Sequence, residues 1–249
     1  MKALVTGASS GIGKEICIYL DSLGYELILV SRDKDKLLEV QNILKNKSKV
    51  ITLDLSNINN CYKLYNLTSK YDVDILVNNA GFGLHGEFVD SDINKEISMI
   101  DLNIKAVHIL TKLFLKDFVN KDKGYILNVS SSAAFLSGPL MATYYSTKSY
   151  VYRLTTAIYE ELKRKNSNVI ISVLCPGPVK TNFNKTANCK FDIKSVDSKY
   201  VAKYAIYKMF KKKLVIIPSL YIKVGIFINR FLPIKLSLKI AYNIQDKKR

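Results

Sequence analysis

Short, nearly unbroken runs of apolar residues alternate along this chain with longer segments in which apolar residues recur every three or four positions. The runs are rich in Val, Ile and Leu, as buried strands are, and the longer segments have the period of helices that bury one face. The runs predict strands at residues 2–6, 26–31, 50–53, 75–78, 125–130, 169–174 and 214–217. The periodic segments predict helices at residues 12–23, 33–44, 56–70, 92–119, 143–165 and 198–211.

This alternation of strand and helix predicts the fold class. It indicates an α/β protein with a single doubly wound parallel sheet of about seven strands and helices on both faces. In this Rossmann-type arrangement, ligands bind outside the carboxyl ends of the strands. No internal repeat and no linker divides residues 1–217. We therefore expect one main domain over residues 1–217 and a C-terminal extension over residues 218–249.

The composition is that of a globular protein, since 48% of the 249 residues are hydrophobic. No apolar run is long enough to span a bilayer. The first expected strand begins at residue 2 and leaves no room for a signal peptide, so we expect a cytoplasmic protein. The net charge of +17 is concentrated near the end of the chain, where residues 203–249 carry 12 Lys and Arg against one acidic residue.

Cysteine and histidine usage predicts no metal site. The four cysteines are Cys17, Cys61, Cys175 and Cys189. Their spacing suggests neither a metal-ligand pair nor a disulfide framework, and we expect buried free thiols. His85 and His108 are the two histidines, so a zinc site or a His-based triad has little to build on.

A glycine-rich segment, TGASSGIG at residues 6–13, follows the first expected strand and opens the first helix. Its GxxxGxG spacing lets the backbone turn tightly and approach a pyrophosphate, which the N–H groups of the helix N-terminus would bind. The strand–loop–helix context therefore predicts a dinucleotide site. Its expected residues are Gly7, Ser9, Ser10, Gly11, Ile12 and Gly13.

The end of the second strand bears on the choice of cofactor. A carboxylate there would bind the adenosine ribose and select NAD, but this chain has the neutral Ser31 and the cationic Arg32. A guanidinium can hold a 2′-phosphate with two hydrogen bonds, so we predict NADP(H). The alternative is an ordinary surface arginine. Lys14, Lys34 and Lys36 could assist, or could be solvated.

Polar residues also end the third and fourth strands. Asp54 could meet the adenine ring at the switch point of the sheet. The segment Asn78-Asn79-Ala80-Gly81 could tie adjacent strands together through its side-chain amides and leave a glycine where the cofactor approaches. Turn chemistry alone would also explain this segment.

Tyr144 and Lys148 stand four residues apart on an expected helix, thirteen residues after Ser131. Positions i and i+4 share a helix face, so the Lys148 ammonium should lower the pKa of the Tyr144 phenol toward the range useful for acid–base catalysis. Tyr145 is the rival, because it is three residues from Lys148. The offset from Ser131 favours Tyr144.

Together these motifs resemble the short-chain dehydrogenase/reductase family, in its NADP-preferring bacterial type, over roughly residues 2–217. The matching elements are TGASSGIG at 6–13, Asp54 with Leu55, NNAG at 78–81, Asn103, Ser131, Tyr144 with Lys148, and PGPVKT at 176–181. The resemblance implies that the main domain is the dinucleotide-binding catalytic domain. It also implies that Asn79, Ala80 and Gly81 contact the cofactor.

The resemblance assigns roles to the remaining residues. Lys148 would bind the nicotinamide ribose, Ser131 would donate to the substrate carbonyl oxygen, and Asn103 would hold a water of a proton relay. Asn103, Tyr144 and Lys148 would thus belong to both the catalytic and the cofactor set. Pro176, Gly177, Val179 and Thr181 would lie beside the nicotinamide, and residues 182–200, with Phe183 and Phe191, would form a substrate lid.

The expected function is hydride transfer between NADP(H) and a small-molecule carbonyl or secondary alcohol, with Tyr144 as the acid or base. A 3-oxoacyl thioester reductase is the runner-up. Two hypotheses from other functional classes are a catalytically silent NADP(H) sensor and a membrane-surface scaffold. By family analogy, the long helices near 92–119 and 143–165 would form a homodimer or homotetramer.

The C-terminal extension reads as two short amphipathic helices, at 219–231 and 234–242, broken by Pro233. These helices could cover the substrate pocket or form an oligomer interface. Their basic and apolar faces could instead make peripheral contact with the inner membrane surface. We expect no nucleic-acid partner, because no recognition motif accompanies the charge.

Overall fold

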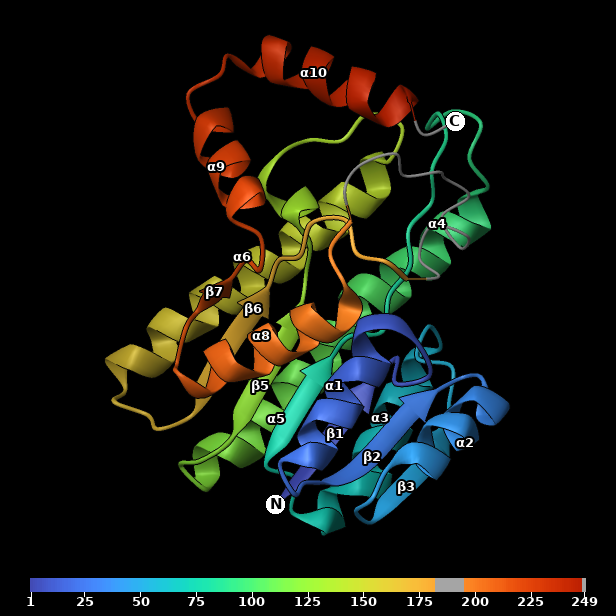
Figure 1. Cartoon of the computed structure of the whole chain (residues 1–249), viewed down its shortest axis with the longest axis vertical. Coiled ribbons are helices and arrows are strands. Elements are labelled where there is room, and N and C mark those ends of the chain that lie inside the picture. The colour runs from blue at the N-terminus through green and yellow to red at the C-terminus, as the bar shows by residue number, and fades with distance from the viewer. Residues whose placement is uncertain (182–194, 248–249) are drawn as a thin grey trace.

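The computed structural model describes residues 1–181 and 195–247. Within these residues a seven-stranded, wholly parallel sheet lies between layers of helices, which confirms the predicted fold class (Figure 1). The strand order is β3-β2-β1-β4-β5-β6-β7. The strands are β1 (Lys2–Thr6), β2 (Glu26–Ser31), β3 (Ser48–Thr52), β4 (Ile75–Asn78), β5 (Tyr125–Val129), β6 (Ile170–Leu174) and β7 (Val215–Ile216).

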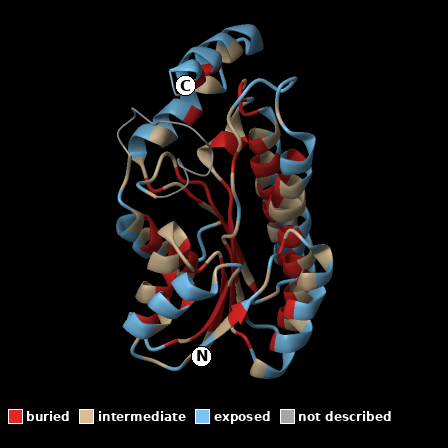
Figure 2. Ribbon diagram, turned by 90° about the vertical axis from the view of Figure 1, so that its right-hand side faces the viewer, coloured by how far each residue is buried: buried red, intermediate tan, exposed pale blue. Residues whose placement is uncertain are grey.

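The apolar strands bury both faces of the sheet, as Figure 2 shows by the red ribbon between the helical layers. In β1, Ala3 and Val5 join one core cluster and Leu4 joins the other, because successive side chains point to opposite faces. The first cluster packs against α1 (Gly11–Ser22) and α8 (Ser198–Phe210). The second packs against α3 (Ile58–Thr68), α5 (Val107–Asn120) and α6 (Ala142–Arg164).

Most helix starts match the sequence. Asp33 caps α2 (Lys34–Ile43), Asn57 caps α3, and Asp92 caps α4 (Ile93–Ile100), each by accepting a backbone N–H of the first turn. Two further helices form the extension, α9 (Leu220–Asn229) and α10 (Ile234–Asp246). The last of these runs one turn beyond the predicted end at residue 242.

The prediction of one continuous helix at 92–119 is wrong in one respect. A π-helical segment, Asp101–Ala106, separates α4 from α5. Such a wide turn changes the direction in which its side chains project and often occurs at functional sites. Here it carries Asn103, which is fully buried. Hydrophobic periodicity did not reveal the interruption, because the apolar residues continue through it.

Side-chain amides join neighbouring strands, as the paired asparagines predicted. Asn78 on β4 donates to Oδ1 of Asn128 on β5 at 2.9 Å and to Oγ1 of Thr111 on α5 at 3.0 Å. Asn128 in turn donates to Thr155 on α6 at 3.0 Å. This buried network fixes α5 and α6 against the strands whose carboxyl ends carry the polar motifs.

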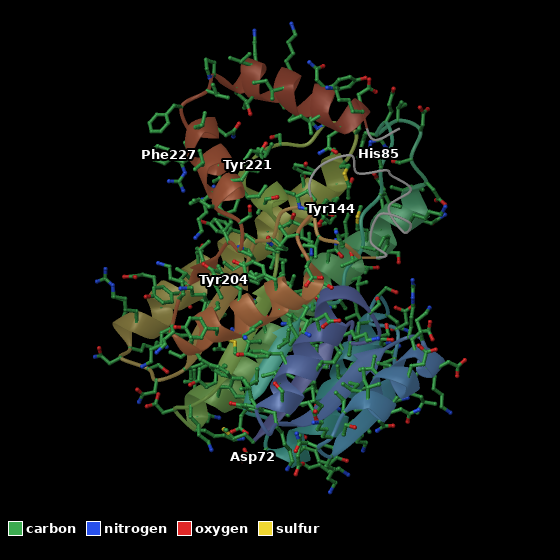
Figure 3. The ribbon with its side chains drawn as sticks, in the orientation of Figure 1. Asp72, His85, Tyr144, Tyr204, Tyr221 and Phe227 are labelled. Carbon is green, nitrogen blue, oxygen red and sulfur yellow. The ribbon has the colours of Figure 1, made fainter. Side chains whose placement is uncertain are left out.

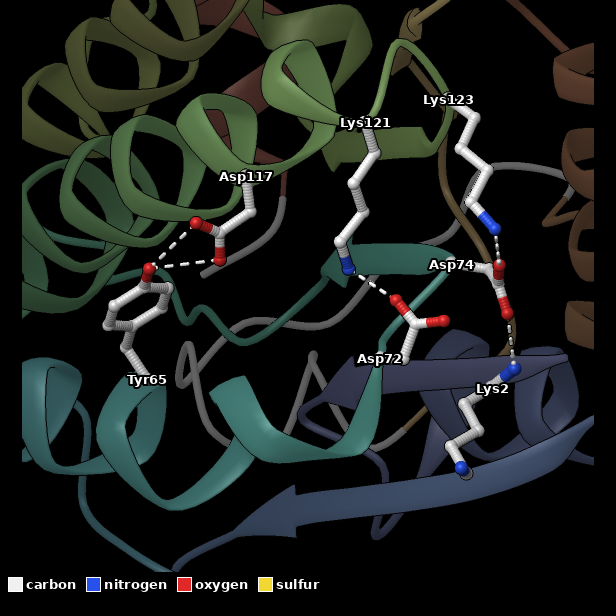
Figure 4. A network of polar contacts seen from close by, with 7 residues as sticks. All are labelled: Lys2, Tyr65, Asp72, Asp74, Asp117, Lys121 and Lys123. Atoms are coloured by element: carbon white, nitrogen blue, oxygen red, sulfur yellow. Dashed lines mark hydrogen bonds and ion pairs between the residues drawn. The ribbon is translucent and has the colours of Figure 1, made fainter.

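The amino-terminal edge of the sheet is held by polar contacts that play no part in the cavity (Figure 4). The Lys2 backbone N–H donates to Asp74 at 2.8 Å, and Lys121 pairs with Asp72. An exposed ion pair such as Lys121–Asp72 contributes about 0–1 kcal/mol. These contacts join connecting segments at the amino-terminal ends of the strands, whereas ligands of such sheets bind at the carboxyl ends.

The extension lies at that opposite edge. In Figure 1, α9 and α10 stand beyond the carboxyl ends of the strands, away from the sheet. None of the helices in the described part of the chain combines the length and apolar character required to cross a membrane.

Candidate active site

A cavity of about 460 Å³ opens at the carboxyl ends of the central strands. It lies where the strand order reverses between β1 and β4, the switch point at which open α/β sheets bind ligands. Most of the predicted site residues line it. They are Gly7, Ser9, Ser10, Gly11, Ile12, Ser31, Arg32, Asp54, Leu55, Asn79, Ala80, Gly81, Ser131, Tyr144, Lys148, Pro176, Gly177, Val179 and Thr181.

Two predicted residues, Gly13 and Asn103, are not in that lining. A Cβ atom on Gly13 would lie 2.2 Å from the Gly7 carbonyl oxygen, so Gly13 permits close packing of α1 on the loop. Gly7 has a φ of +65°, which favours glycine, and a Cβ there would lie 2.7 Å from Nδ2 of Asn79. Asn79 donates to the carbonyls of Thr6 and Gly7, at 3.0 and 3.2 Å, and thereby holds the loop in place.

The N-terminus of α1 faces the cavity. Ser10 occupies the N-cap position but its side chain makes no capping hydrogen bond, whereas the helices α2 and α3 are capped by side chains. The first N–H groups of α1 therefore remain for a ligand, and the helix dipole favours an anion there. Together with the glycine loop, this arrangement fits the pyrophosphate of a dinucleotide.

The adenosine end of the cavity carries one charged residue, Asp33, that the sequence analysis did not place there. Arg32 lies exposed at the rim, and Asp33 and Lys36 also line the cavity. Lys36 Nζ lies 2.6 Å from Asp33 Oδ2, and this hydrogen bond lowers the pKa of Asp33. Asp33 was missed as a lining residue, although its place just after Arg32 was a signal. For Lys36 the sequence allows either assistance to the cofactor or solvation, and the structure places it in the lining.

The opposite end brings Tyr144 and Lys148 together as the helical spacing predicted. Lys148 Nζ lies 5.8 Å from the centre of the Tyr144 ring and donates to the Val129 carbonyl at 3.1 Å. Burial lowers the pKa of Lys148 to about 8. Among the described residues, no carboxylate forms an ion pair with it. Most of the Lys148 side chains are still cationic at neutral pH.

Ser131 occupies the turn after β5. Its Oγ accepts the Ala133 N–H at 3.1 Å and so caps the 3₁₀ segment Ser132–Phe135. A hydroxyl has one proton to donate in addition to its lone pairs. Because the backbone uses a lone pair, the Ser131 proton remains for a ligand oxygen in the cavity.

Asn103 braces the site from behind. Its Nδ2 donates to the Phe82 carbonyl at 2.9 Å and to Thr147 Oγ1 at 3.1 Å, and its Oδ1 accepts the Phe82 N–H at 3.1 Å. Thr147 also donates to the Tyr144 carbonyl at 2.7 Å. The amide therefore links the segment after β4 to the helix that carries Tyr144. Its role in holding a water stays a prediction.

Tyr145 is held by contacts with α10 and with Gly138. Its hydroxyl accepts a hydrogen bond from Gln245 on α10, and a Cβ on Gly138 would lie 2.4 Å from its ring. Burial raises the pKa of Tyr145 to about 12, which opposes a role in proton transfer. Gln245 was missed because the predicted helix ended before it.

The substrate end of the cavity has an apolar lining that the sequence did not indicate, formed by Phe82 and Met141. Phe82 and Met141 pack in one small cluster with Tyr144. The proposed lid falls partly outside the described residues, including Phe183 and Phe191. Of the rest, Val196 pairs with Val179, and α8 begins at Ser198.

Sequence comparison gives a family. The family model described as short chain dehydrogenase matches residues 1–191. A very-long-chain 3-oxoacyl-CoA reductase of Danio rerio is 35% identical over 202 residues, which are 77% of this chain and 63% of that relative. An uncharacterized oxidoreductase of Staphylococcus aureus is 30% identical over 214 residues, which are 85% of this chain and 91% of that relative.

Solved structures agree in fold. A short-chain dehydrogenase from Sphingobium yanoikuyae in complex with NADPH superposes with a TM-score of 0.83 at 25% identity, covering 90% of each chain. One from Burkholderia phymatum in complex with NAD has a TM-score of 0.85 at 22% identity, covers 92% of each chain, and supports the fold alone.

Proposed function

The chain belongs to the short-chain dehydrogenase/reductase family of oxidoreductases, and from this we propose that it transfers hydride between NADP(H) and a carbonyl or secondary alcohol. The observation that carries the proposal is a single cavity that joins the uncapped N-terminus of α1 to Ser131, Tyr144 and Lys148. A nicotinamide cofactor fits the family. The choice of NADP(H) and of the substrate class is our proposal.

The protein residues prepare the reacting oxygen and its proton. When bound, the cofactor supplies or accepts the hydride. The Ser131 hydroxyl donates to the substrate oxygen and orients it beside the Tyr144 phenol. Tyr144 donates its proton to that oxygen in reduction and accepts it in oxidation. The buried Lys148 ammonium, 5.8 Å from the phenol ring, favours the tyrosinate and so eases the proton's departure.

Arg32 supports NADP(H) over NAD(H). It stands at the end of β2, on the cavity rim, where the ribose 2′-position of a bound dinucleotide would lie. Its planar guanidinium suits a phosphate held by two hydrogen bonds. Since relatives of this fold bind either cofactor, this preference rests on Arg32.

A 3-oxoacyl thioester is the second substrate candidate. The very-long-chain 3-oxoacyl-CoA reductases of Danio rerio and Rattus norvegicus are 35% and 31% identical to this chain. The chain spans 63% and 65% of their lengths. The apolar lining by Phe82 and Met141 beside Tyr144 suits an acyl chain. We propose this class as the first to test.

Turnover tests the proposal. Purified protein is given NADPH and a panel of ketones, aldehydes and 3-oxoacyl thioesters, and cofactor oxidation is followed by absorbance. We expect Tyr144→Phe to lower kcat by about 10²–10⁴-fold, as loss of a general acid does, and Tyr145→Phe to retain most activity. The reverse outcome would make Tyr145 the acid. NADPH binding without turnover on any carbonyl would favour the sensor.

Partners and location follow as proposals. We propose a homodimer or homotetramer that pairs through α4, α5 and α6, as family analogy suggests. We also propose that residues 1–217 form the catalytic domain and that residues 218–249 form a separate extension. This extension would make peripheral contact with a membrane. A cytoplasmic location stays a prediction.

A further inference from the structure

The C-terminal arm, residues 219–247, leaves most of its large apolar side chains exposed. Phe227, Phe231 and Ile234 are 60%, 74% and 71% exposed. Its buried residues are Ile226, Ala241 and Gln245. The exposed large apolar residues are Leu220, Tyr221, Val224, Phe227, Ile228, Phe231, Ile234, Leu236, Ile240, Tyr242 and Ile244. Contiguous surfaces of this kind mark sites that bind a protein or a membrane.

Charge distinguishes between these occupants. No Asp or Glu occurs from Ser198 to Gln245, while the arm carries exposed cations. These are Lys223, Arg230, Lys235, Lys239 and Lys247. In a two-fold dimer the same patch meets itself, so burying this face against a second copy would bring like charges together. An anionic lipid surface accepts both the apolar side chains and the cations.

The arm contacts the rest of the protein near the cavity through both of its helices. On α9, Ile222 packs on Gly177, whose Cβ would lie only 2.7 Å from Cγ1 of Ile222. On α10, Gln245 donates to Tyr145, and its carbonyl bonds Nε2 of His85 at 3.0 Å. Gly177 and Tyr145 both line the cavity, so the arm is attached to its wall at the loop after β6 and at α6, while no described residue of the arm itself lines the cavity.

This attachment gives the outer face a defined direction. Figure 3 shows Phe227 projecting from α9 away from the strands, while Tyr144 lies between the arm and the sheet. Phe88 and Val89, which are 68% and 84% exposed, extend from the segment that begins at His85. Exposed apolar side chains therefore occur both on the arm and on the segment that His85 ties to it.

We propose that the outer face of the arm docks on an anionic bilayer surface, with Phe227, Phe231 and Ile234 in the acyl region and the lysines at the headgroups. Docked in this way, the cavity mouth faces the membrane interface, and an apolar carbonyl substrate enters from the lipid. The inference rests on the proposed membrane contact and carbonyl chemistry, but docking itself needs no turnover.

Flotation of the whole protein with vesicles tests the docking. Vesicles of phosphatidylcholine alone are compared with vesicles that also contain phosphatidylglycerol. We expect binding to the anionic vesicles, weakened at high salt. Since a basic residue near such a surface contributes a factor of about five, Lys235→Gln/Lys239→Gln should weaken partitioning roughly 25-fold. A control with the same loss of charge, Lys211→Gln/Lys213→Gln at the far end of α8, should weaken it much less.

A second variant tests the apolar contribution. Phe227→Ser/Phe231→Ser should lose most vesicle binding at unchanged charge, and both variants should keep wild-type NADPH affinity in lipid-free buffer. That affinity separates failure of docking from failure of the fold or of the proposed cofactor site. Equal binding to neutral vesicles, or equal effects of the arm and control variants, would overturn the proposal. So would a lipid-independent dimer, detected by sedimentation, that Phe227→Ser/Phe231→Ser dissociates.

Discussion

Replacing Arg32 by Ala isolates the charge that we hold responsible for cofactor choice. Lys36 and Asp33 lie beside it on the rim, but they pair with each other at 2.6 Å and contribute little net charge. Among the described lining residues at this end, Arg32 is therefore the cation that forms no ion pair and can meet a 2′-phosphate. Because Arg32 is exposed, its interaction with a 2′-phosphate should be that of a charged hydrogen bond in a wet site, about 1.5–3 kcal/mol. This corresponds to an increase of about 10- to 150-fold in the NADPH Kd.

Fluorescence titration of NADPH and NADH against wild type and Arg32→Ala measures this effect. NADH lacks the 2′-phosphate, so its Kd should change little, and the cofactor preference should collapse in the variant. Arg32→Lys is the matched control, since it keeps a point charge but loses the planar fork, and it should fall between the two. Equal weakening of both cofactors would mean that Arg32 supports the fold of the rim. No change in either would refute the assignment of NADP(H) on this residue.

Two further predictions follow from buried contacts. The Lys148 ammonium is lost as pH rises through its lowered pKa of about 8, so kcat/KM should fall above about pH 8. The unfolded chain keeps that proton up to the ordinary lysine pKa of 10.5, so between about pH 8 and 10.5 the unfolded state binds more protons than the folded state. The free energy of unfolding of the wild type, relative to that of Lys148→Met, should therefore rise with pH in this range. A difference between the two proteins that stays constant with pH would contradict this. Gly13→Ala places a Cβ 2.2 Å from the Gly7 oxygen and should destabilise the protein by about 1–3 kcal/mol in urea unfolding. Gly225→Ala, with open space in α9, should be neutral or stabilising, and equal losses in the two variants would contradict the packing argument.

Local patterns were sufficient for much of the fold and site. The strands could be predicted because both faces of the sheet are buried, which leaves nearly continuous apolar runs. The glycine loop could be predicted because positive φ at Gly7 is a local requirement. The placement of Tyr144 beside Lys148 follows from helix geometry alone. In each case the signal and the structure lie within a few residues of each other.

The interruption at Asp101–Ala106 and the end of α10 could not be predicted in the same way. A π-helical turn does not remove apolar residues, so the periodicity continues through it. The last turn of α10 is mostly polar, and the contacts of its Gln245 with Tyr145 and His85 come from distant parts of the chain.

The sequence by itself therefore determined the order of strands and helices, the loop for a dinucleotide and the pairing of Tyr144 with Lys148, because backbone geometry and side-chain period act over short distances. The tertiary structure decided which tyrosine is tied to the arm, how far burial lowers the pKa of Lys148, and where the apolar face of the arm points. Gln245 and Tyr145 are 100 residues apart in the chain, and only the packed domain brings them together. Desolvation and such long-range contacts depend on every neighbouring element, so no local pattern encodes them.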